Sequence, residues 1–226
     1  MRIASCIAAA FVLTTALFGK SVPSVSSECA DAIAEEDFCS KTTAPLIMGP
    51  VDVEMFVVVS KEYYPTVESV LEKYLRFSDW PAYVELSGMG VPTFATSEDR
   101  GLKTIQKDGK AVEVQVHYAD YTSPAPPPVI SHRVAGEFYY EKVPAYDGAL
   151  ISMEFSLQPG GKGLEKQSGS IHAIDCNTVS ACEDNQWLLY YQTSVRSNID
   201  ILPRLAAPSV LAPIESIVIG MLLINE

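Results

Sequence analysis

Three histidines are the side chains in this sequence best suited to catalytic chemistry. His117, His132 and His172 fall on three predicted strands, and three such ligands could hold a catalytic zinc ion. The sequence does not place them on one face, because His117 alternates in register with Glu113 and Gln115 on the polar side of its strand. We therefore predict no metal site.

Nucleophilic and phosphate chemistry also lack a motif. A histidine could be combined with Asp120 or Asp175 and a serine, but there is no G-x-S-x-G elbow or comparable context. The glycine-rich run at 160–163 has no Ser/Thr-led helix after it and indicates a turn rather than a phosphate-binding loop. We predict no catalytic residue and no cofactor.

The charge balance excludes some partners. The 226 residues carry a formal net charge of −12. Nucleic acids and anionic membrane surfaces are bound by basic patches, so we predict neither as the main partner. A soluble, acidic, exported protein accounts for the charge.

The N-terminal segment is typical of export. Residues 1–19 combine Arg2 with an apolar run and a small residue at Gly19, as a secretory signal peptide does. We predict cleavage between residues 19 and 27 and a secreted or periplasmic location. We expect residues 20–50 to form a cysteine-bearing extension and residues 51–226 to form one domain.

Four cysteines remain after cleavage, and an even number in an exported protein indicates disulfides. Three pairings are possible, and proximity in sequence favours Cys29–Cys39 and Cys176–Cys182. Their spacings do not fit the C-x2-C ligand pairs of structural zinc sites.

The middle of the chain is organised around one helical stretch. The apolar run at 51–60 predicts a buried strand, and the stripe within 66–77 recurs at a helical period. Pro65 suits the start of that helix. Pro81 biases Trp80 away from helical geometry and predicts a break there.

The rest of the middle is strand-like. We expect an irregular strand at 87–97, a hairpin turn at Asp108-Gly109, and strands at 112–118, 129–143, 149–157, 168–176 and 186–197. Short connections between such strands favour an antiparallel sheet with one apolar face to be covered.

The tail at 205–224 is mostly apolar. Because Pro208 and Pro213 would disrupt a straight helix, we expect Pro203 and Pro208 to lie in the approach and a buried helix to start near Pro213. A membrane anchor is the alternative, but Glu215 and the prolines weaken it, and we expect no stable membrane span.

The chain resembles the START-like (SRPBCC) superfamily in the order of its elements: strand, helix, aromatic-proline turn, antiparallel strands and apolar C-terminal helix. The local match is the segment 70–84, VLEKYLRFSDWPAYV. The resemblance covers about residues 51–225. It implies an α+β helix-grip fold, in which a curved antiparallel sheet wraps around a C-terminal helix, with a short helical segment after the first strand.

The resemblance also implies a cavity between sheet and helix that holds a lipid or other apolar small molecule. The apolar faces of the predicted strands and the final helix offer ligand-binding candidates, and each could equally be a core residue: Tyr118, Phe138, Tyr140, Met153, Phe155, Trp187, Tyr191 and Met221.

Two other functions stay open. The first is an enzyme of the cyclase, dehydratase or hydrolase type, with His132 beside Tyr140 or Glu154 as a polar cluster. Glu137, Glu141 and Glu154 could act as acid or base if they were buried, but they are predicted to face water. An enzyme is therefore the less favoured hypothesis. The second is a secreted interaction protein whose sheet is packed without a cavity.

Overall fold

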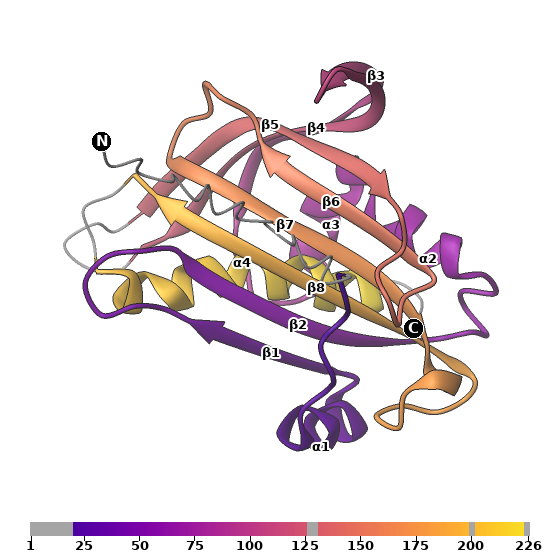
Figure 1. Ribbon diagram of the computed structural model, residues 1–226. Helices are drawn as coiled ribbons and strands as arrows, with labels where there is room; N and C mark the ends of the chain where they lie inside the picture. The colour runs from indigo at the N-terminus through magenta and orange to yellow at the C-terminus, as the bar shows by residue number, and fades with distance from the viewer. Residues whose placement is uncertain (1–19, 126–130, 199–201, 224–226) are drawn as a thin grey trace, which may run out of the picture.

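The computed structural model describes residues 20–125, 131–198 and 202–223, so the predicted signal peptide at 1–19 lies outside the described residues. Eight antiparallel strands form one curved sheet in the order β1-β2-β8-β7-β6-β5-β4-β3 (Figure 1). The strands are β1 (Phe38–Thr43), β2 (Val51–Ser60), β3 (Thr93–Lys107), β4 (Lys110–Pro124), β5 (Ser131–Val143), β6 (Ile151–Leu157), β7 (Leu164–Asp175) and β8 (Gln186–Ser197).

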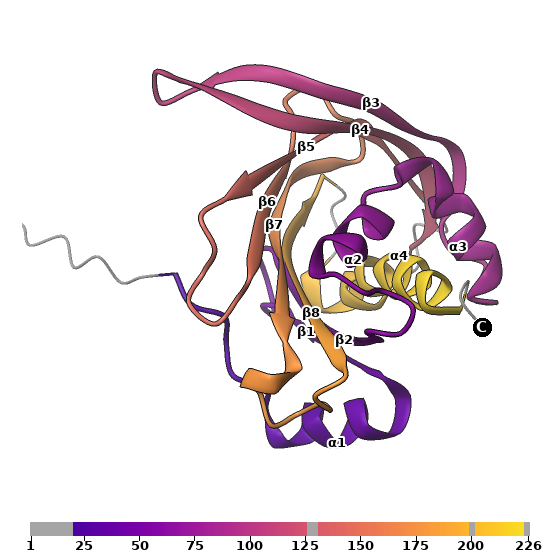
Figure 2. The same cartoon turned by 90° about the vertical axis from the view of Figure 1, so that its right-hand side faces the viewer.

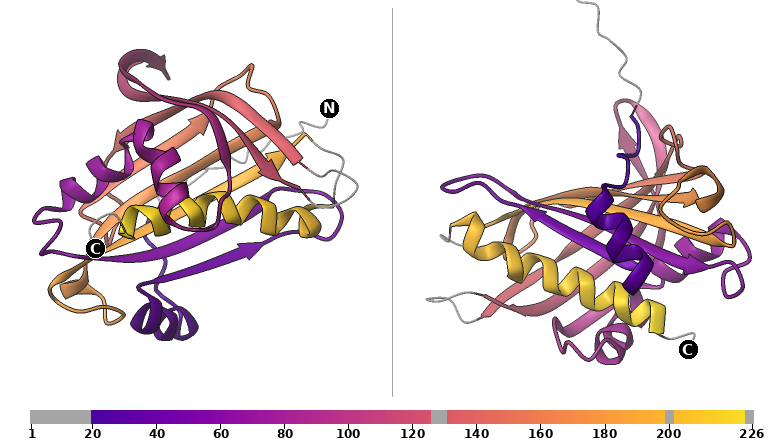
Figure 3. Two further views of the ribbon diagram at one scale, coloured as in Figure 1. Left: turned by 180° about the vertical axis from the view of Figure 1, so that it is seen from behind. Right: turned by 90° about the horizontal axis from the view of Figure 1, so that it is seen from below.

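Helices cover both faces of this sheet. α2 (Val67–Tyr74), α3 (Trp80–Leu86) and the long α4 (Pro203–Leu223) lie on the concave face (Figure 2). α1 (Ser27–Glu36) packs on the outer face beside β1 and β2. Seen from behind and from below, α4 runs along the sheet (Figure 3). The predicted curved sheet around a C-terminal helix is confirmed.

The extension at 20–50 is integrated into this sheet. β1 pairs with β2 along its whole length, from Phe38 opposite Val57 to Thr43 opposite Asp52. Ser26 caps α1 by accepting a hydrogen bond from the backbone N–H of Cys29. The extension therefore adds an edge strand and a helix that shields the outer face.

The helical stretch after β2 differs from the prediction of one helix at 66–77. α2 ends at Tyr74, a short 3-10 helix spans Phe77–Asp79, and α3 follows directly. Pro81 sits in the first turn of α3, where its missing N–H leaves no acceptor unpaired, so it helps to start a helix rather than to end one. This break brings Phe77 and Trp80 over the sheet.

β3 and β4 form a long hairpin. Its turn is Asp108-Gly109, and both residues have positive φ (52° and 74°), as the predicted two-residue turn requires. β3 begins only at Thr93, later than the predicted strand at 87–97. The strand prediction at 186–197 coincides with β8.

α4 starts ten residues earlier than predicted, and Pro208 and Pro213 lie inside it. A proline has no N–H to donate to the carbonyl four residues before it. For Pro213 that carbonyl belongs to Ser209, and the Ser123 hydroxyl donates a hydrogen bond to it (3.3 Å). A side chain from β4 thus replaces a helix hydrogen bond, which the sequence alone does not reveal.

By length and composition, α4 is the one helix within the described ranges that could cross a membrane. Its Ile217, Val218 and Met221 are nevertheless buried in the core under the sheet. Two polar contacts also fix it: Ser40 donates to Glu215 (2.5 Å), and Ser87 shares a hydrogen bond with Ser216 (2.9 Å). These contacts are those of a core helix.

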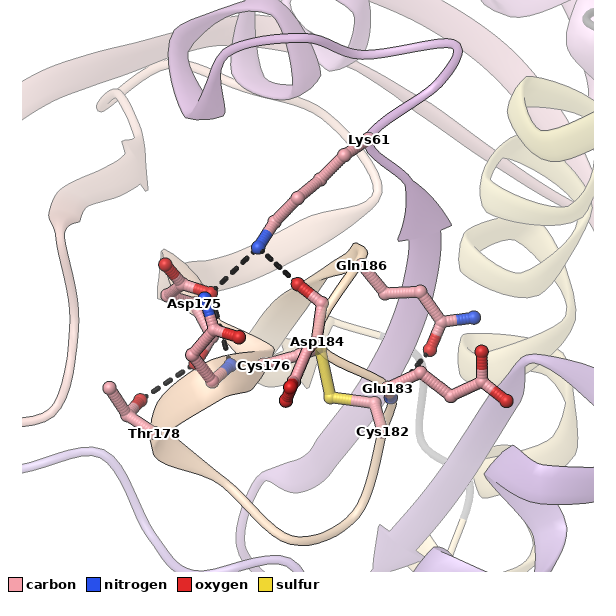
Figure 4. Close-up of a disulfide and its surroundings, with 9 residues drawn as sticks. Lys61, Asp175, Cys176, Thr178, Cys182, Glu183, Asp184 and Gln186 are labelled. Carbon is pink, nitrogen blue, oxygen red and sulfur yellow. Dashed lines mark hydrogen bonds and ion pairs between the residues drawn. A yellow bond between two sulfur atoms is a disulfide. The ribbon is translucent and has the colours of Figure 1, made fainter.

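Both predicted disulfides are present. Cys29–Cys39 joins α1 to β1, and Cys176–Cys182 closes the loop between β7 and β8. Beside the second bridge, the Lys61 ammonium contacts the Asp175 carboxylate (2.8 Å) and the Asp184 carbonyl (2.7 Å) (Figure 4). Disulfides of this kind persist in oxidising compartments.

Replacing Cys29 and Cys39 by serine is expected to lower the free energy of unfolding by about 3 kcal/mol, because the bridge restricts the unfolded chain. Thermal unfolding of the non-reduced proteins measures the loss. The matched double serine variant at Cys176 and Cys182, which closes a shorter loop, should lose about 2 kcal/mol. Unchanged stability of the first variant would show that α1 is held by packing alone.

Candidate functional site

The space between the sheet and α4 contains two small neighbouring cavities. The inner cavity has a volume of about 50 Å³, and its wall includes Tyr74, Trp80, His117, Phe138, Tyr140, Phe155 and Tyr191. The outer cavity has a volume of about 80 Å³ and is lined by residues such as Ser123, His132, Leu164, Val195, Ala206 and Ser209.

Four side chains line both cavities, and we call them the septum. Tyr121, Gln167, Pro213 and Ile214 line the inner and the outer cavity alike. Tyr121, Gln167 and Ile214 are only half-buried. The two cavities are therefore neighbours that share part of their walls.

Four of the eight predicted ligand-binding residues meet at the inner cavity. Phe138 and Tyr140 come from β5, Phe155 from β6 and Tyr191 from β8. Their rings are in contact: Tyr140 lies 5.2 Å and Tyr191 lies 5.6 Å from Phe155, centroid to centroid. Stacked rings of this kind make a rigid apolar wall.

Three further predicted residues lie on the concave side but outside the walls of the two cavities. Met153 and Met221 are buried in the core cluster. Trp187 packs near α2, where its indole N–H donates to the Tyr64 carbonyl (2.7 Å) and Lys61 lies 4.3 Å above its ring. These three therefore serve packing in this structure.

The placement of Tyr118 on the concave face was wrong. In the β4–β5 register His117 faces Phe138, so odd-numbered residues of this part of β4 point to the concave side and Tyr118 points outward. Its ring is covered by the Arg100 guanidinium at 4.1 Å. The apolar series Val114, Val116 and Tyr118 suggested the opposite, but it belongs to the outer face.

The predicted placement of His117 was wrong for the same reason, because odd-numbered residues of this part of β4 point to the concave side. The sequence assigned it to the polar side, yet its side chain is only 1% exposed. Its ring stacks on Phe77 (4.1 Å between centroids) and meets the edge of Trp80 (4.6 Å). The signal available in the sequence was the second alternation, Gln115, His117, Ala119 and Tyr121, whose last three members line the cavity.

The cavity walls carry hydroxyls but no charge. Burial raises the pKa of Tyr121 to about 12 and the pKa values of Tyr74 and Tyr140 well above their usual range. These hydroxyls are therefore protonated at neutral pH. Among the lining residues that the structure describes there is no Asp, Glu, Lys or Arg, so the site disfavours charged groups.

The third histidine lies on the other face of the sheet. His172 is fully buried, with one ring nitrogen bonded to Ser152 (2.8 Å) and the other to Ser170 (2.7 Å). Gln192 also donates to Ser170 (2.7 Å). A buried imidazole with both nitrogens paired is a structural group. In the described part of the chain, no cluster of three His, Cys, Asp or Glu residues could hold a metal ion.

A larger hollow, about 740 Å³, lies on the outer face and is open to solvent. Three of the carboxylates that line it have partners: Glu54 accepts from Tyr190, Glu141 from Lys107, and Glu154 from Tyr146. Glu154 therefore lies on the face opposite His132 and Tyr140, which removes it from the polar cluster considered for an enzyme. We prefer the two smaller cavities under α4 as the candidate site, because their walls are mostly apolar and aromatic.

The order of strands and the position of α4 define an α+β protein with the helix-grip fold that was predicted from the sequence. No protein-family model and no curated protein matches the sequence. Matches are found among solved structures.

A START superfamily protein from Mycobacterium smegmatis has 11% identity and a TM-score of 0.42, over 84% of this chain and 99% of that one. Human STARD10 has 11% identity and a TM-score of 0.43, over 89% and 82%. The major latex-like protein 151 of Panax ginseng has 10% identity and a TM-score of 0.37, over 82% and 99%. At such identities the likeness concerns the fold alone.

Proposed function

We propose that this protein binds a lipid or another uncharged apolar small molecule between its sheet and α4. The observation that carries the proposal is the pair of neighbouring cavities under α4, walled by aromatic rings and free of charged side chains among the described residues. Enclosed apolar space with a few polar groups is the usual form of a small-molecule site.

The two cavities must join before such a ligand can bind. Their volumes of about 50 and 80 Å³ are smaller than the roughly 300 Å³ at the low end of known ligand pockets. The ligand would displace the Tyr121 and Ile214 side chains and then lie along Phe138, Tyr140, Phe155 and Tyr191.

We also propose that the protein is exported. The Arg2-led apolar segment acts as a signal peptide, and the two disulfides form in the oxidising compartment that receives the chain. The ligand would therefore be met outside the cytoplasm, in the periplasm or the medium.

Binding is tested with N-phenyl-1-naphthylamine, an uncharged probe whose fluorescence rises in apolar surroundings. We expect saturable binding to the delipidated protein. Ala206→Phe fills the outer cavity from α4 and should weaken binding at least tenfold, because the probe and the new ring need the same space. Native mass spectrometry of protein purified without delipidation should also show a bound apolar species.

Ala212→Phe is the matched control. Ala212 is half-buried on the same helix as Ala206 but lines neither cavity. It should bind the probe like the wild type. Absence of binding to the wild-type protein, or equal loss in both variants, would contradict a site under α4 and favour a packed interaction domain.

A further inference from the structure

His117 is the one ring in the inner cavity wall that carries a buried polar atom without a partner. Within the part of the chain that the structure describes, its Nδ1 makes no hydrogen bond. The ring stacks on Phe77 and meets the edge of Trp80. Buried polar atoms are nearly always paired. His117 belongs to a residue set that lines the cavity, so its unpaired Nδ1 can accept a hydrogen bond from a group bound there.

The tautomer of His117 follows from its neighbours. The carbonyl of Phe77 can only accept, so the Ser97 hydroxyl donates its proton there (2.5 Å). The Ser97 oxygen then accepts from His117 Nε2–H (3.0 Å). A neutral imidazole has a single N–H, so Nδ1 presents a bare lone pair.

Nδ1 stays an acceptor throughout the physiological pH range. Burial lowers the pKa of His117 to about 3. The rings next to it belong to Phe77, Trp80 and Phe138, and the Trp80 N–H already donates to the Tyr74 carbonyl. A ligand group that satisfies Nδ1 must therefore bring a proton of its own.

We propose that His117 Nδ1 accepts a hydrogen bond from the hydroxyl of a neutral apolar alcohol and so selects this class of ligand. The inference rests on the proposed function and narrows it. The hydroxyl end occupies the inner cavity beside His117, and the apolar body extends past the septum into the outer cavity. Carboxylates and phosphates are excluded, since neither cavity wall offers a described cationic side chain.

The test compares two isomers of one formula, 1-nonanol and 1-methoxyoctane, by calorimetric titration of the delipidated protein. Only the alcohol has a proton to donate. We expect it to bind roughly five- to tenfold more tightly than the ether, as one net hydrogen bond provides. Nonanoate at pH 7.5 should bind more weakly than either isomer.

Two variants test whether His117 is the residue that distinguishes the alcohol from the ether. His117→Phe keeps a ring against Phe77 but removes the acceptor, and its alcohol-to-ether ratio should fall to about one. Ala212→Phe, on α4 but outside both cavity walls, should keep the wild-type ratio. A ratio near one in the wild type, or an unchanged ratio in His117→Phe, overturns the role of His117 while leaving apolar binding intact.

A measurement on the unsubstituted protein covers the case in which His117→Phe does not fold. Imidazole ¹⁵N resonances should show Nε2 protonated and Nδ1 bare, and 1-nonanol should shift the Nδ1 resonance upfield. A proton found on Nδ1 overturns the inference without reference to any ligand. If neither isomer binds the wild type, the proposed function fails together with this inference.

Discussion

Gly220→Ala is expected to destabilise the protein by about 3 kcal/mol, at the upper end of typical overpacking costs. A Cβ at position 220 would lie 1.7 Å from the backbone carbonyl oxygen of Tyr83, so α3 and α4 would have to separate. Tyr83 is fully buried and cannot yield. Urea unfolding should show a lower midpoint with an unchanged slope.

The sign of the stability change on Gly220→Ala tests whether α3 and α4 cross closely. In an open helix, glycine to alanine stabilises by about 1 kcal/mol, because alanine has the higher helix propensity. Ala212→Gly measures that intrinsic difference in α4 itself and should cost about 1 kcal/mol. A Gly220→Ala variant as stable as the wild type would mean that α3 and α4 do not cross as closely as the structure has them.

Acidification from pH 7 to pH 5 is expected to remove about 2 kcal/mol of stability for each of His117 and His172. Burial lowers the pKa of His117 to about 3 and that of His172 to about 4. Unfolded imidazoles titrate near pH 6.5, so between that pH and the folded pKa values only the unfolded chain binds protons. Stability therefore rises with pH across this window and levels off above it.

Chemical unfolding at several pH values measures this slope. His117→Phe should reduce the slope by about one proton and leave the part due to His172, whatever its effect on absolute stability. Glu154 raises and Lys20 lowers the pKa of His172, and each acts less strongly than burial. Equal stability at pH 5 and pH 7 would contradict neutral, buried histidines in the folded protein.

The sequence predicted the architecture well because the architecture depends on patterns that recur along the chain. The alternation at 186–197, the Asp108-Gly109 turn and the two short cysteine spacings each depend on neighbouring residues, and each is confirmed. The stripe at Val67, Val70, Leu71 and Tyr74 likewise predicted the buried face of α2.

The failures occurred where distant residues decide the outcome. β4 alternates apolar residues on both of its faces, and only its register with β5 shows that His117, not Tyr118, points to α4. In the same way, α4 continues through Pro213, and Ser123 donates to the carbonyl that Pro213 leaves free. Neither interaction is visible in a local window of sequence, and both lie at the candidate site.

The pairing of β2 with β8 has a consequence for how the chain folds. β2 lies near the start of the sheet in sequence, but its inner neighbour is the last strand, with Val57 opposite Leu189 and Val59 opposite Trp187. Until β8 has been synthesised, β2 keeps one unpaired edge beside apolar side chains, the kind of edge that promotes aggregation. Pairings so distant in sequence also slow folding. The nascent chain therefore cannot complete its sheet before the polypeptide is nearly whole, and fragments ending before β8 should aggregate rather than fold.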